Sequence, residues 1–393
     1  MHLYDVEKYP IYECPDGSGN TMLEKIAASG AKWLILHEDW SLIQNYGVPK
    51  DKEEFLRFAD ACHKLGLKLM VYFGYEISTL MPGFLDVCEE ALNKNVNGNY
   101  VGGWQRKPAQ RDFTVCYKGS YSDTMIERVA YVMDELKVDG IYTDGTYVPW
   151  ECANEAHFCG YRDADGQLHD TYPIWAVRKH VKRLYECVHQ RGGIIDTHQS
   201  SCCMMMTLAF ADSYFDGENI QGMVAENIGS LKLDSFRCEF MGLNMGIPCN
   251  FISYVNEKFT MRSIAGITLL HNVFPRGRTL EDLKFMSDIW KIYDDFGVEN
   301  ATWHPYWEQT DIVCPEKKNV YISYFENNGN YLLMMFSLEK EGGKVCFTIP
   351  QSVKITDLLD LDKIRFRQDG MAEVSLTYGG NKILLVERNE KNE

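Results

Sequence analysis

The sequence has no run of about 18 apolar residues, so a membrane-spanning helix is not expected. Its first residues, MHLYDVEKYPIYECPDG, lack the basic region and apolar stretch of a secretory signal peptide. Positive charge is also scarce, because 40 Lys and Arg face 56 Asp and Glu for a formal net charge of -16. An acidic surface repels phosphate backbones, so nucleic acid is not expected as a partner.

A disulfide framework and the common cofactor motifs are absent as well. The 13 cysteines are an odd number scattered over a long chain, which is typical of reduced thiols in a cytoplasmic protein. The chain has no glycine-rich phosphate loop and no His-Glu-x-x-His sequence. We therefore expect a cytoplasmic protein without a cofactor, and the pattern leaves its oligomeric state open.

What the chain does have is an alternation of apolar strand-like runs and amphipathic helices. The expected strands lie at 31–36, 67–75, 111–117, 138–144, 192–200, 208–218, 246–254 and 269–275. The expected helices lie at 52–65, 122–136, 173–190, 233–245, 260–270 and 279–296, and a long insertion covers 145–170. Repeated strand–helix units imply parallel pairing with right-handed crossovers. About eight of them indicate an α/β fold, the (β/α)8 TIM barrel.

The pattern changes after about residue 305. NVYISYFE and YLLMMFSLE flank the turn residues NNGN, and further alternating runs follow without long helices. We expect a (β/α)8 barrel catalytic domain over 1–305 and a C-terminal antiparallel β-sandwich domain over 311–393.

Polar side chains recur at the carboxyl ends of the expected strands, where TIM barrels carry their chemistry. They include acids, histidines and an amide: His37, Glu38, Asp39, Glu76, Asp144, Asp196, His198, Gln199, Asp216, Glu218 and His271. Aromatic residues accompany them: Trp40, Tyr72, Tyr75, Trp104, Tyr147, Trp150, Tyr214 and Trp303. Carboxyl groups among aromatic rings suit a carbohydrate, since acids act on the glycosidic bond and rings cover the apolar faces of sugars. The expected partner is an oligosaccharide or glycoside substrate.

Glycosidases place two carboxyl groups across one bond. The fourth and sixth strands of an eight-stranded barrel lie on facing arcs, so Asp144 and Glu218 can point into one pocket. Asp-Gly pairs also end strands as plain turns, which is the ordinary alternative for Asp144. Asp216 and Asp196 remain rivals of Glu218 for the second role. The other polar residues are candidate binders of sugar hydroxyls or, alternatively, a hydrogen-bonded layer that closes the barrel.

A metal site is not predicted. Cys152, His157 and Cys159 offer three zinc donors and would need a fourth, but their spacing fits no standard zinc finger. A packed insertion of soft residues is the simpler interpretation.

Several segments together resemble a known group of proteins. GAKWLILHEDW, CHKLGLKLMVYFGYE, VDGIYTDGT, RGGIIDTHQS and ADSYFDGE look like an uncharacterised group of bacterial glycoside-hydrolase-like barrels. The resemblance runs from about Gly30 to Trp307. The plan is also similar to the α-galactosidase/α-glucosidase superfamily and to α-L-fucosidases. In those enzymes a nucleophilic Asp ends strand four and many carry the acid/base on strand six, which implies these roles for Asp144 and Glu218.

The sequence departs from those enzymes in two motifs. It has neither the Lys-x-Asp segment of α-galactosidases nor the tryptophan-rich Asp motif of α-glucosidases, so the sugar and the linkage stay open. FDGE also resembles the paired acids of family 123 β-N-acetylgalactosaminidases, whose substrate supplies its own acetamido nucleophile. The expected function is a retaining, exo-acting, α-glycosidase-like hydrolase. The alternatives are a substrate-assisted N-acetylhexosaminidase using Asp216 and Glu218, or a non-catalytic carbohydrate-binding barrel.

Overall fold

The computed structural model describes residues 1–8, 11–12, 14, 17–199, 203–218, 220, 227–243, 246–252, 260–308, 311–350, 353–362 and 364–388. The predicted strand and helix ends at 200, 244–245 and 253–254 lie outside these residues. The chain forms two compact units, residues 1–216 with 245–248 and residues 217–244 with 249–393. The predicted division into 1–305 and 311–393 remains a prediction.

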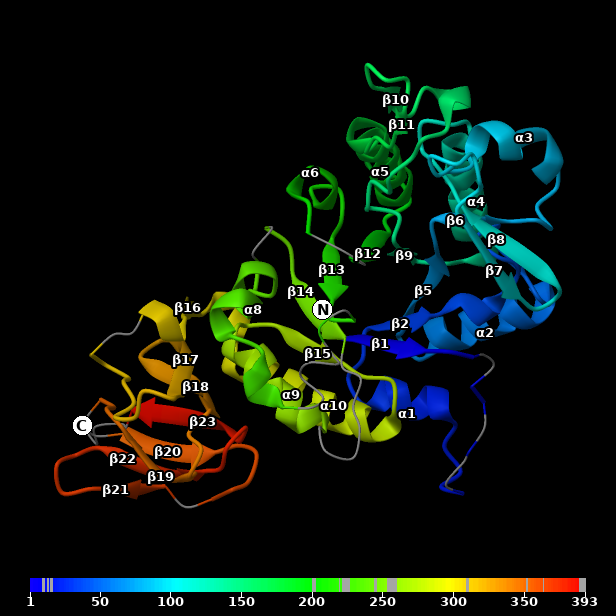
Figure 1. The fold of residues 1–393 in the computed structure, drawn as a ribbon. Helices are drawn as coiled ribbons and strands as arrows, with labels where there is room; N and C mark the ends of the chain where they lie inside the picture. The colour runs from blue at the N-terminus through cyan, green and yellow to red at the C-terminus, as the bar shows by residue number, and fades with distance from the viewer. Residues whose placement is uncertain are drawn as a thin grey trace. The chain divides into compact units, whose positions relative to one another are not determined.

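The barrel strands form an eight-stranded sheet in the order β1-β2-β5-β9-β12-β13-β14-β15. The strands of the first unit are β1 (Leu3–Val6), β2 (Trp33–Leu36), β5 (Lys68–Phe73), β9 (Gly140–Asp144), β12 (Ile194–His198) and β13 (Ser213–Asp216). They pair in parallel from β1 through β13 (Figure 1). β14 (Cys249–Ile252) and β15 (Phe274–Arg276) of the second unit also pair in parallel. This sheet, with its helices and a separate antiparallel region, confirms the predicted fold class.

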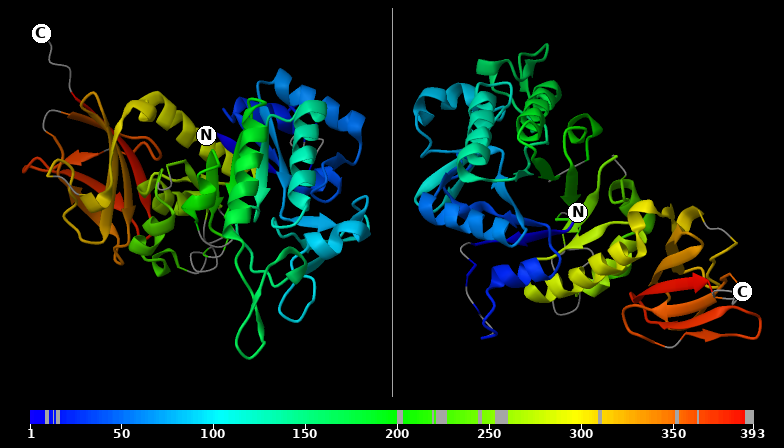
Figure 2. Two further views of the ribbon diagram at one scale, coloured as in Figure 1. Left: turned by 90° about the horizontal axis from the view of Figure 1, so that it is seen from above. Right: turned by 180° about the vertical axis from the view of Figure 1, so that it is seen from behind.

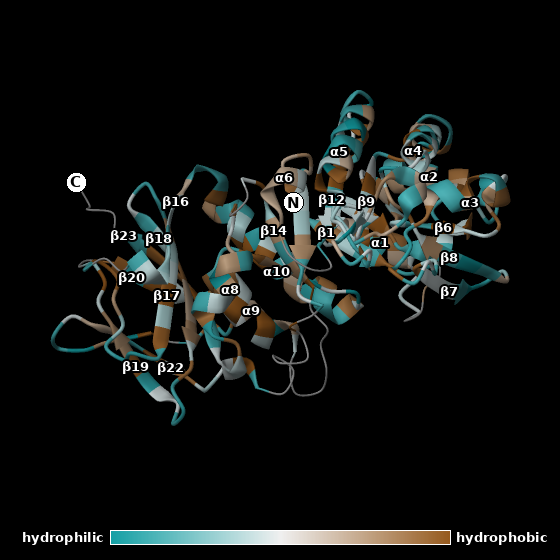
Figure 3. Cartoon of the chain, turned by 45° about the horizontal axis from the view of Figure 1, so that its top comes forward, coloured by the Kyte–Doolittle hydropathy of each residue, from teal (hydrophilic) through white to brown (hydrophobic). Residues whose placement is uncertain are grey.

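Amphipathic helices cover the strands of the first unit. They are α1 (Met22–Ala28), α2 (Lys52–Lys64), α4 (Tyr121–Leu136), α5 (Ile174–His189) and α6 (Met205–Leu208). α2 packs on β5, α5 packs on β12, and α4 lies beside α5 (Figure 2). Apolar and polar residues alternate along α2 and α5 (Figure 3), as expected where one face is buried.

Two excursions extend from the first unit. The first follows β5 and contains β6 (Glu76–Ser78), α3 (Phe84–Ala91), β7 (Gly102–Arg106) and β8 (Gln110–Thr114). β6, β8 and β7 form a small antiparallel sheet. The second is the predicted insertion, with η2 (Glu155–His157) and the short hairpin of β10 (Tyr161–Arg162) and β11 (Leu168–His169). Short elements η1 (Glu38–Trp40), β3 (Ser41–Ile43) and β4 (Val48–Pro49) follow β2.

The sequence interpretation of the first barrel strands was partly wrong. Residues 111–117 were expected to form the third barrel strand, but β8 belongs to the antiparallel sheet of the first excursion. The missing strand is β1, which is short, and its LYDV sequence includes a carboxylate. The two errors cancel in the numbering, so β9 is still the fourth strand and β13 the sixth.

The second unit adds the helices η3 (Ile228–Ser230), α8 (Leu233–Glu239), α9 (Met261–Leu270), α10 (Leu280–Phe296), η4 (Val298–Asn300) and η5 (Tyr306–Glu308).

The β-sandwich of the second unit has one sheet of β16 (Thr302–His304), β17 (Val320–Asn327), β18 (Asn330–Ser337), β23 (Asn381–Arg388) and β20 (Val353–Asp357). The other sheet contains β19 (Gly343–Phe347), β22 (Ala372–Leu376) and β21 (Arg365–Phe366). Side chains of both sheets share one core, for example Leu333, Phe347 and Leu384. α9 and α10 pack on the opposite face of the first sheet. In the described residues, no helix is long and apolar enough to cross a membrane.

Candidate active site

Asp144 ends β9 and is held by side chains from both flanking strands. The Tyr72 hydroxyl of β5 donates to Asp144 Oδ2 at 3.2 Å, and His198 Nδ1 of β12 lies 2.9 Å from Asp144 Oδ1. Since a carboxylate only accepts, Nδ1 of His198 carries the proton of this hydrogen bond. Burial, followed by the negative charge of Asp144, raises the pKa of Tyr72, so its hydroxyl stays protonated as a donor.

Strand register explains why these three side chains meet. His198 is the direct neighbour of Asp144 across the β9–β12 pair, and Tyr72 is the neighbour of Tyr142 across the β5–β9 pair. Side chains two residues apart on a strand share a face, so Tyr72 lies on the same side as Asp144. The His198 ring is further fixed by a parallel stack on Phe215 at 4.6 Å. The site therefore rests on the regular sheet.

His37 and His198 both lie beside buried acids. His37 Nε2 lies 2.9 Å from Asp5 Oδ1 of β1, and the ring contacts Tyr142 at 5.1 Å between centroids. His198 Nε2 lies 3.8 Å from Asp216 Oδ1. Acids and histidines thus alternate along the carboxyl ends of β1, β2, β9, β12 and β13.

Glu76 is a buried acid beside this row. Its carboxylate accepts a hydrogen bond from Asn45 Nδ2 at 3.1 Å. Burial, together with the negative charges of Asp144 and Asp112, raises the pKa of Glu76 to about 8. The carboxyl is therefore mostly protonated at neutral pH and can donate a hydrogen bond, as a carboxylate cannot.

Tyr75, Trp104 and Trp150 form an aromatic platform next to Asp144. Tyr75 stacks on Trp150 with ring centroids 4.9 Å apart, and its edge faces Trp104 at 6.3 Å. A Cβ at Gly145, where φ is 61°, would come within 2.3 Å of the Tyr75 ring, so only glycine allows the ring this close to the end of β9. Trp104 is 45% exposed and offers ring surface to a ligand.

Two candidate binders of sugar hydroxyls are engaged in ion pairs instead. Glu38 pairs with Arg106 of β7, and the same guanidinium lies 2.5 Å from Asp112. Asp39 is exposed and pairs with Lys50 at 2.6 Å. Both acids lie on η1, one turn beyond the end of β2.

Other predicted binders are buried, and most of them bond to neighbouring groups of the protein. Trp40 and Tyr147 are 1% and 0% exposed, and they donate to the carbonyls of Tyr72 and Phe210. Asp196 accepts from Ser213 Oγ at 2.5 Å and, like Gln199, has no exposed surface. The side-chain amide of Gln199 is buried without a hydrogen-bond partner among the described residues.

Glu218 and His271 belong to the second unit, whereas Asp144 belongs to the first. Glu218 follows β13 by two residues and is exposed. His271 ends α9 and has no exposed surface, and burial lowers its pKa to about 4. Its Nδ1 lies 2.8 Å from the Ile267 carbonyl, as expected for a neutral ring that donates within its own helix. His271 is thus a packing residue in its unit.

Sequence reasoning missed Asp5 as a site residue, and it included Tyr72 only as one of the aromatic residues around the strand ends, without its bond to Asp144. Asp5 lies on β1, which was not recognised as a strand. Tyr72 lies in an expected strand, and its position two residues before Gly74 on an apolar run was the available signal. A period of two would have placed it on the same side as the strand's last residues.

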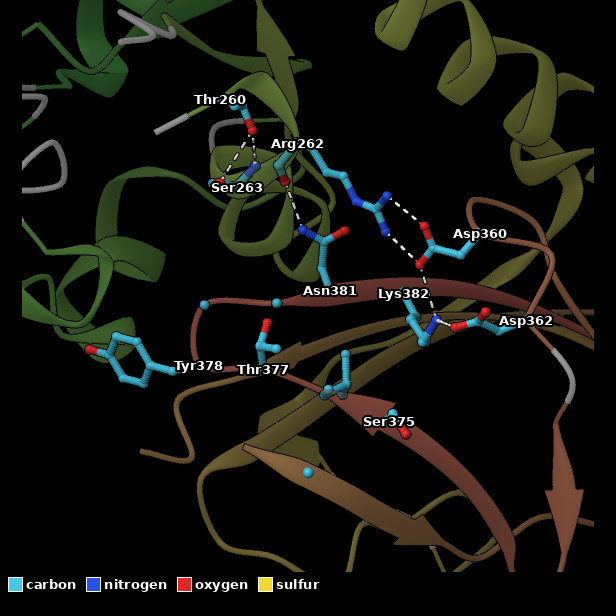
Figure 4. Close-up of a pocket in the computed structure, with 14 residues that line it drawn as sticks. Thr260, Arg262, Ser263, Asp360, Asp362, Ser375, Thr377, Tyr378, Asn381 and Lys382 are labelled. Carbon is cyan, nitrogen blue, oxygen red and sulfur yellow. Dashed lines mark hydrogen bonds and ion pairs between the residues drawn. The ribbon is translucent and has the colours of Figure 1, made fainter. Parts of the chain in front are cut away.

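A separate polar cavity of about 470 Å³ lies in the second unit (Figure 4). Its charged side chains neutralise one another, because Arg262 pairs with Asp360, and Lys382 pairs with Asp360 and Asp362. This cavity has none of the residues that the sequence predicted for the site.

The chain was compared with known proteins. A model of the C-terminal domain of glycoside hydrolase 123 matches residues 286–367. No curated protein matches the chain in sequence. Among solved structures, the trehalose-6-phosphate hydrolase (TreA) of Bacillus licheniformis superposes with a TM-score of 0.65 at 10% identity, covering 98% of this chain and 99% of that one.

Two further structures share the fold. The noncanonic maltogenic α-amylase AmyB of Thermotoga neapolitana has a TM-score of 0.64 at 12% identity, with 98% of both chains covered. A GH27 β-L-arabinopyranosidase of Geobacillus stearothermophilus has a TM-score of 0.59 at 10% identity, covering 100% of this chain and 96% of that one. The family match points to glycoside hydrolases, in agreement with the enzyme class predicted from the sequence, and the solved structures show a shared fold.

Proposed function

We propose that the protein is a retaining, exo-acting glycoside hydrolase with Asp144 as its nucleophile and Glu218 as its acid/base. One observation carries the choice of Asp144. Its side chain is 24% exposed, whereas the side chains of Asp5 and Asp216 are 5% and 4% exposed. Glu76 and Asp196 are buried residues as well. Among these strand-end acids of the first unit, Asp144 is the one whose carboxylate can reach a substrate.

The contacts of Asp144 suit nucleophilic attack. Tyr72 and His198 each bond one carboxylate oxygen, which fixes the carboxyl plane. In the proposed reaction an Asp144 oxygen bonds to the anomeric carbon as the glycosidic C–O bond breaks, and Glu218 gives its proton to the leaving oxygen. Glu218 then takes a proton from water, whose oxygen displaces Asp144.

The substrate class follows from the aromatic platform and the comparisons. Tyr75, Trp104 and Trp150 offer ring surface beside Asp144, which suits the apolar face of a sugar. Two of the structurally similar proteins are a trehalose-6-phosphate hydrolase and a maltogenic α-amylase, which supports the proposal of an α-glycosidase-like reaction.

The test uses an aryl-glycoside panel with the wild type and an Asp144→Gly variant. We expect hydrolysis by the wild type with the first product in the configuration of the substrate, observed by NMR. Asp144→Gly should be inactive in water and should regain turnover with sodium azide, because azide can occupy the space of the lost carboxylate and attack the anomeric carbon. Asp86→Asn, an exposed acid on α3, is the matched control with normal activity.

Three results would contradict the proposal. Near-normal activity of Asp144→Gly without azide would show that another group attacks the sugar. An inverted product would require a water molecule in place of Asp144 as the attacking group. Glycan binding without any hydrolysis by concentrated wild-type protein would instead support the non-catalytic barrel.

A substrate-assisted N-acetylhexosaminidase using Asp216 and Glu218 is the second candidate. The match of residues 286–367 to the C-terminal domain of glycoside hydrolase 123 favours it. In that case only N-acetylated sugars should be cleaved, thiazoline analogues of the cyclised intermediate should inhibit, and Asp216→Asn should lose more activity than Asp144→Asn.

A further inference from the structure

Four buried side chains with metal-binding atoms meet in the first unit. They are Cys116, Cys152, His157 and Cys159, which are 1%, 0%, 4% and 1% exposed. One sulfur or nitrogen atom of each lies within 4.8 Å of the other three. Cys116 follows β8 by two residues. His157 is the last residue of η2 in the insertion after β9, and Cys152 and Cys159 lie on either side of η2. The fold thus supplies the fourth donor that the local sequence motif lacked.

The spacing of these atoms fits a shared ion and does not fit a disulfide. Cys116 Sγ and Cys159 Sγ lie 3.8 Å apart, whereas bonded sulfurs lie about 2.05 Å apart. Two sulfurs on a tetrahedral zinc ion are separated by about 3.8 Å, because each Zn–S bond is about 2.3 Å long. Cys152 Sγ and His157 Nε2 lie 3.2 Å apart, close enough for both to contact one ion after a small adjustment.

Backbone groups hold the donors in a binding arrangement. His157 Nδ1 lies 2.6 Å from the Glu90 carbonyl, so Nδ1 donates and Nε2 keeps its lone pair facing the thiols. The Asn154 backbone N–H lies 3.4 Å from Cys152 Sγ, as expected for a donor to a thiolate. A purely apolar packing role explains buried cysteines, but it does not explain a histidine oriented in this way among three thiols.

We propose that Cys116, Cys152, His157 and Cys159 bind one structural zinc ion. Three thiolates and one imidazole complete a tetrahedral shell, which leaves no open position for a substrate or a reactive water. Binding of the ion releases the thiol protons to solvent and involves no change of oxidation state. This proposal is independent of the proposed glycosidase activity.

The ion would cross-link the two excursions of the first unit. Cys116 continues from the sheet of β6, β7 and β8, which carries Trp104, and Cys152 is two residues from Trp150. A zinc ion between them would hold the aromatic platform in place, while Asp144 stays on its barrel strand. For the activity, this consequence rests on the proposed function: zinc removal is expected to raise KM for a glycoside more than it lowers kcat.

The first experiment measures the metal content of the purified, reduced full-length protein expressed with added zinc. We expect about one zinc per chain by plasma mass spectrometry, with an X-ray absorption shell of about three sulfurs at 2.3 Å and one nitrogen at 2.0–2.1 Å. Cobalt substitution should give the visible and near-ultraviolet bands of a tetrahedral thiolate site. Absence of bound zinc together with absence of these cobalt bands would overturn the proposal.

Variants then locate the ion. The Cys159→Ser and His157→Ala variants should each lose most of the bound zinc. Cys88→Ser should retain it, because Cys88 lies on α3 in the same unit and outside the cluster. Zinc retained at full occupancy in Cys159→Ser would overturn the assignment. If the cluster variants fail to fold, the wild-type absorption shell decides, since any shell other than three sulfurs and one nitrogen refutes the site.

Discussion

At the scale of single residues, the hydrogen bond from Tyr72 to Asp144 can be tested with a single substitution. The Tyr72 hydroxyl donates to Oδ2 of the proposed nucleophile, and phenylalanine would keep the ring and remove only this hydroxyl. Tyr72→Phe removes one hydrogen bond to a charged group, worth about 1.5–3 kcal/mol. We expect kcat/KM for aryl glycosides to fall about 10- to 100-fold while the fold is retained.

The control for this variant is Tyr161→Phe, which removes a hydroxyl from an exposed ring on β10. Its steady-state kinetics should match those of the wild type. Equal kinetics for Tyr72→Phe and the wild type would show that Tyr72 does not orient Asp144 during the reaction.

At the scale of elements, one ion network joins two neighbouring strands of the second unit. Lys382 of β23 has a side chain only 4% exposed, and its ammonium lies 2.6 Å from Asp357 at the end of β20. It also lies 3.0 Å from Asp360 and 2.9 Å from Asp362 in the loop that follows. This cation thus fixes the loop after β20 against β23 and stabilises the edge of the sandwich.

Lys382→Ala should destabilise the second unit strongly, since it leaves the buried Asp357 carboxylate without its counter-ion. Breaking a buried ion pair costs about 3–5 kcal/mol. Lys354→Ala is the matched control, because Lys354 on β20 pairs with Glu387 at 3.5 Å on the surface and should cost under about 1 kcal/mol. Urea denaturation followed by circular dichroism measures both, and similar midpoints for the two variants would refute the role of Lys382.

Long elements with a repeating apolar pattern could be predicted from the sequence, whereas the sheet to which a short strand belongs could not. Helices α2, α4, α5 and α10 were predicted within a residue or two, because each has a long apolar stripe. Residues 110–114 also alternate as a strand does, but periodicity does not tell which sheet a strand joins. β1 was missed because four residues are too short a window for a pattern.

The candidate site was also predictable from the sequence only in part. Its position at strand ends and the prominence of Asp144 followed from the order of the strands. The partners of Asp144 did not, because they depend on register between strands far apart in the chain. Likewise, the pairing of Glu38 with Arg106 and the meeting of Cys116 with Cys152 depend on excursions whose course no local pattern encodes.

At the scale of the whole molecule, the raised pKa of Glu76 links stability to pH. The ordinary pKa of a glutamate is 4.5, and in the fold it is about 8. Between these values the unfolded chain has lost the proton that the folded chain keeps, so rising pH favours unfolding. The stabilising effect of the protonated group is complete below about pH 4.5 and is lost as pH rises through about 8.

Glu76→Gln removes this dependence, because an amide stays neutral at every pH. We expect the free energy of unfolding of the wild type, relative to Glu76→Gln, to fall by up to about 1.4 kcal/mol per pH unit between the two pKa values. Thermal unfolding of both proteins from pH 5 to 9 measures the difference. Parallel melting temperatures across that range would mean that Glu76 is ionised in the folded protein.

The placement of Asp144 between Tyr72 and His198 has a consequence for how such a protein diversifies. All three side chains stand on adjacent strands β5, β9 and β12, whereas the platform rings Trp104 and Trp150 stand on the two excursions. Under the proposed function, reactivity and sugar selectivity are therefore encoded in separate stretches of the gene. Recombination that exchanges both excursions together would change the platform and keep the proposed nucleophile. Exchange of one excursion alone would separate the platform rings and the four proposed zinc ligands.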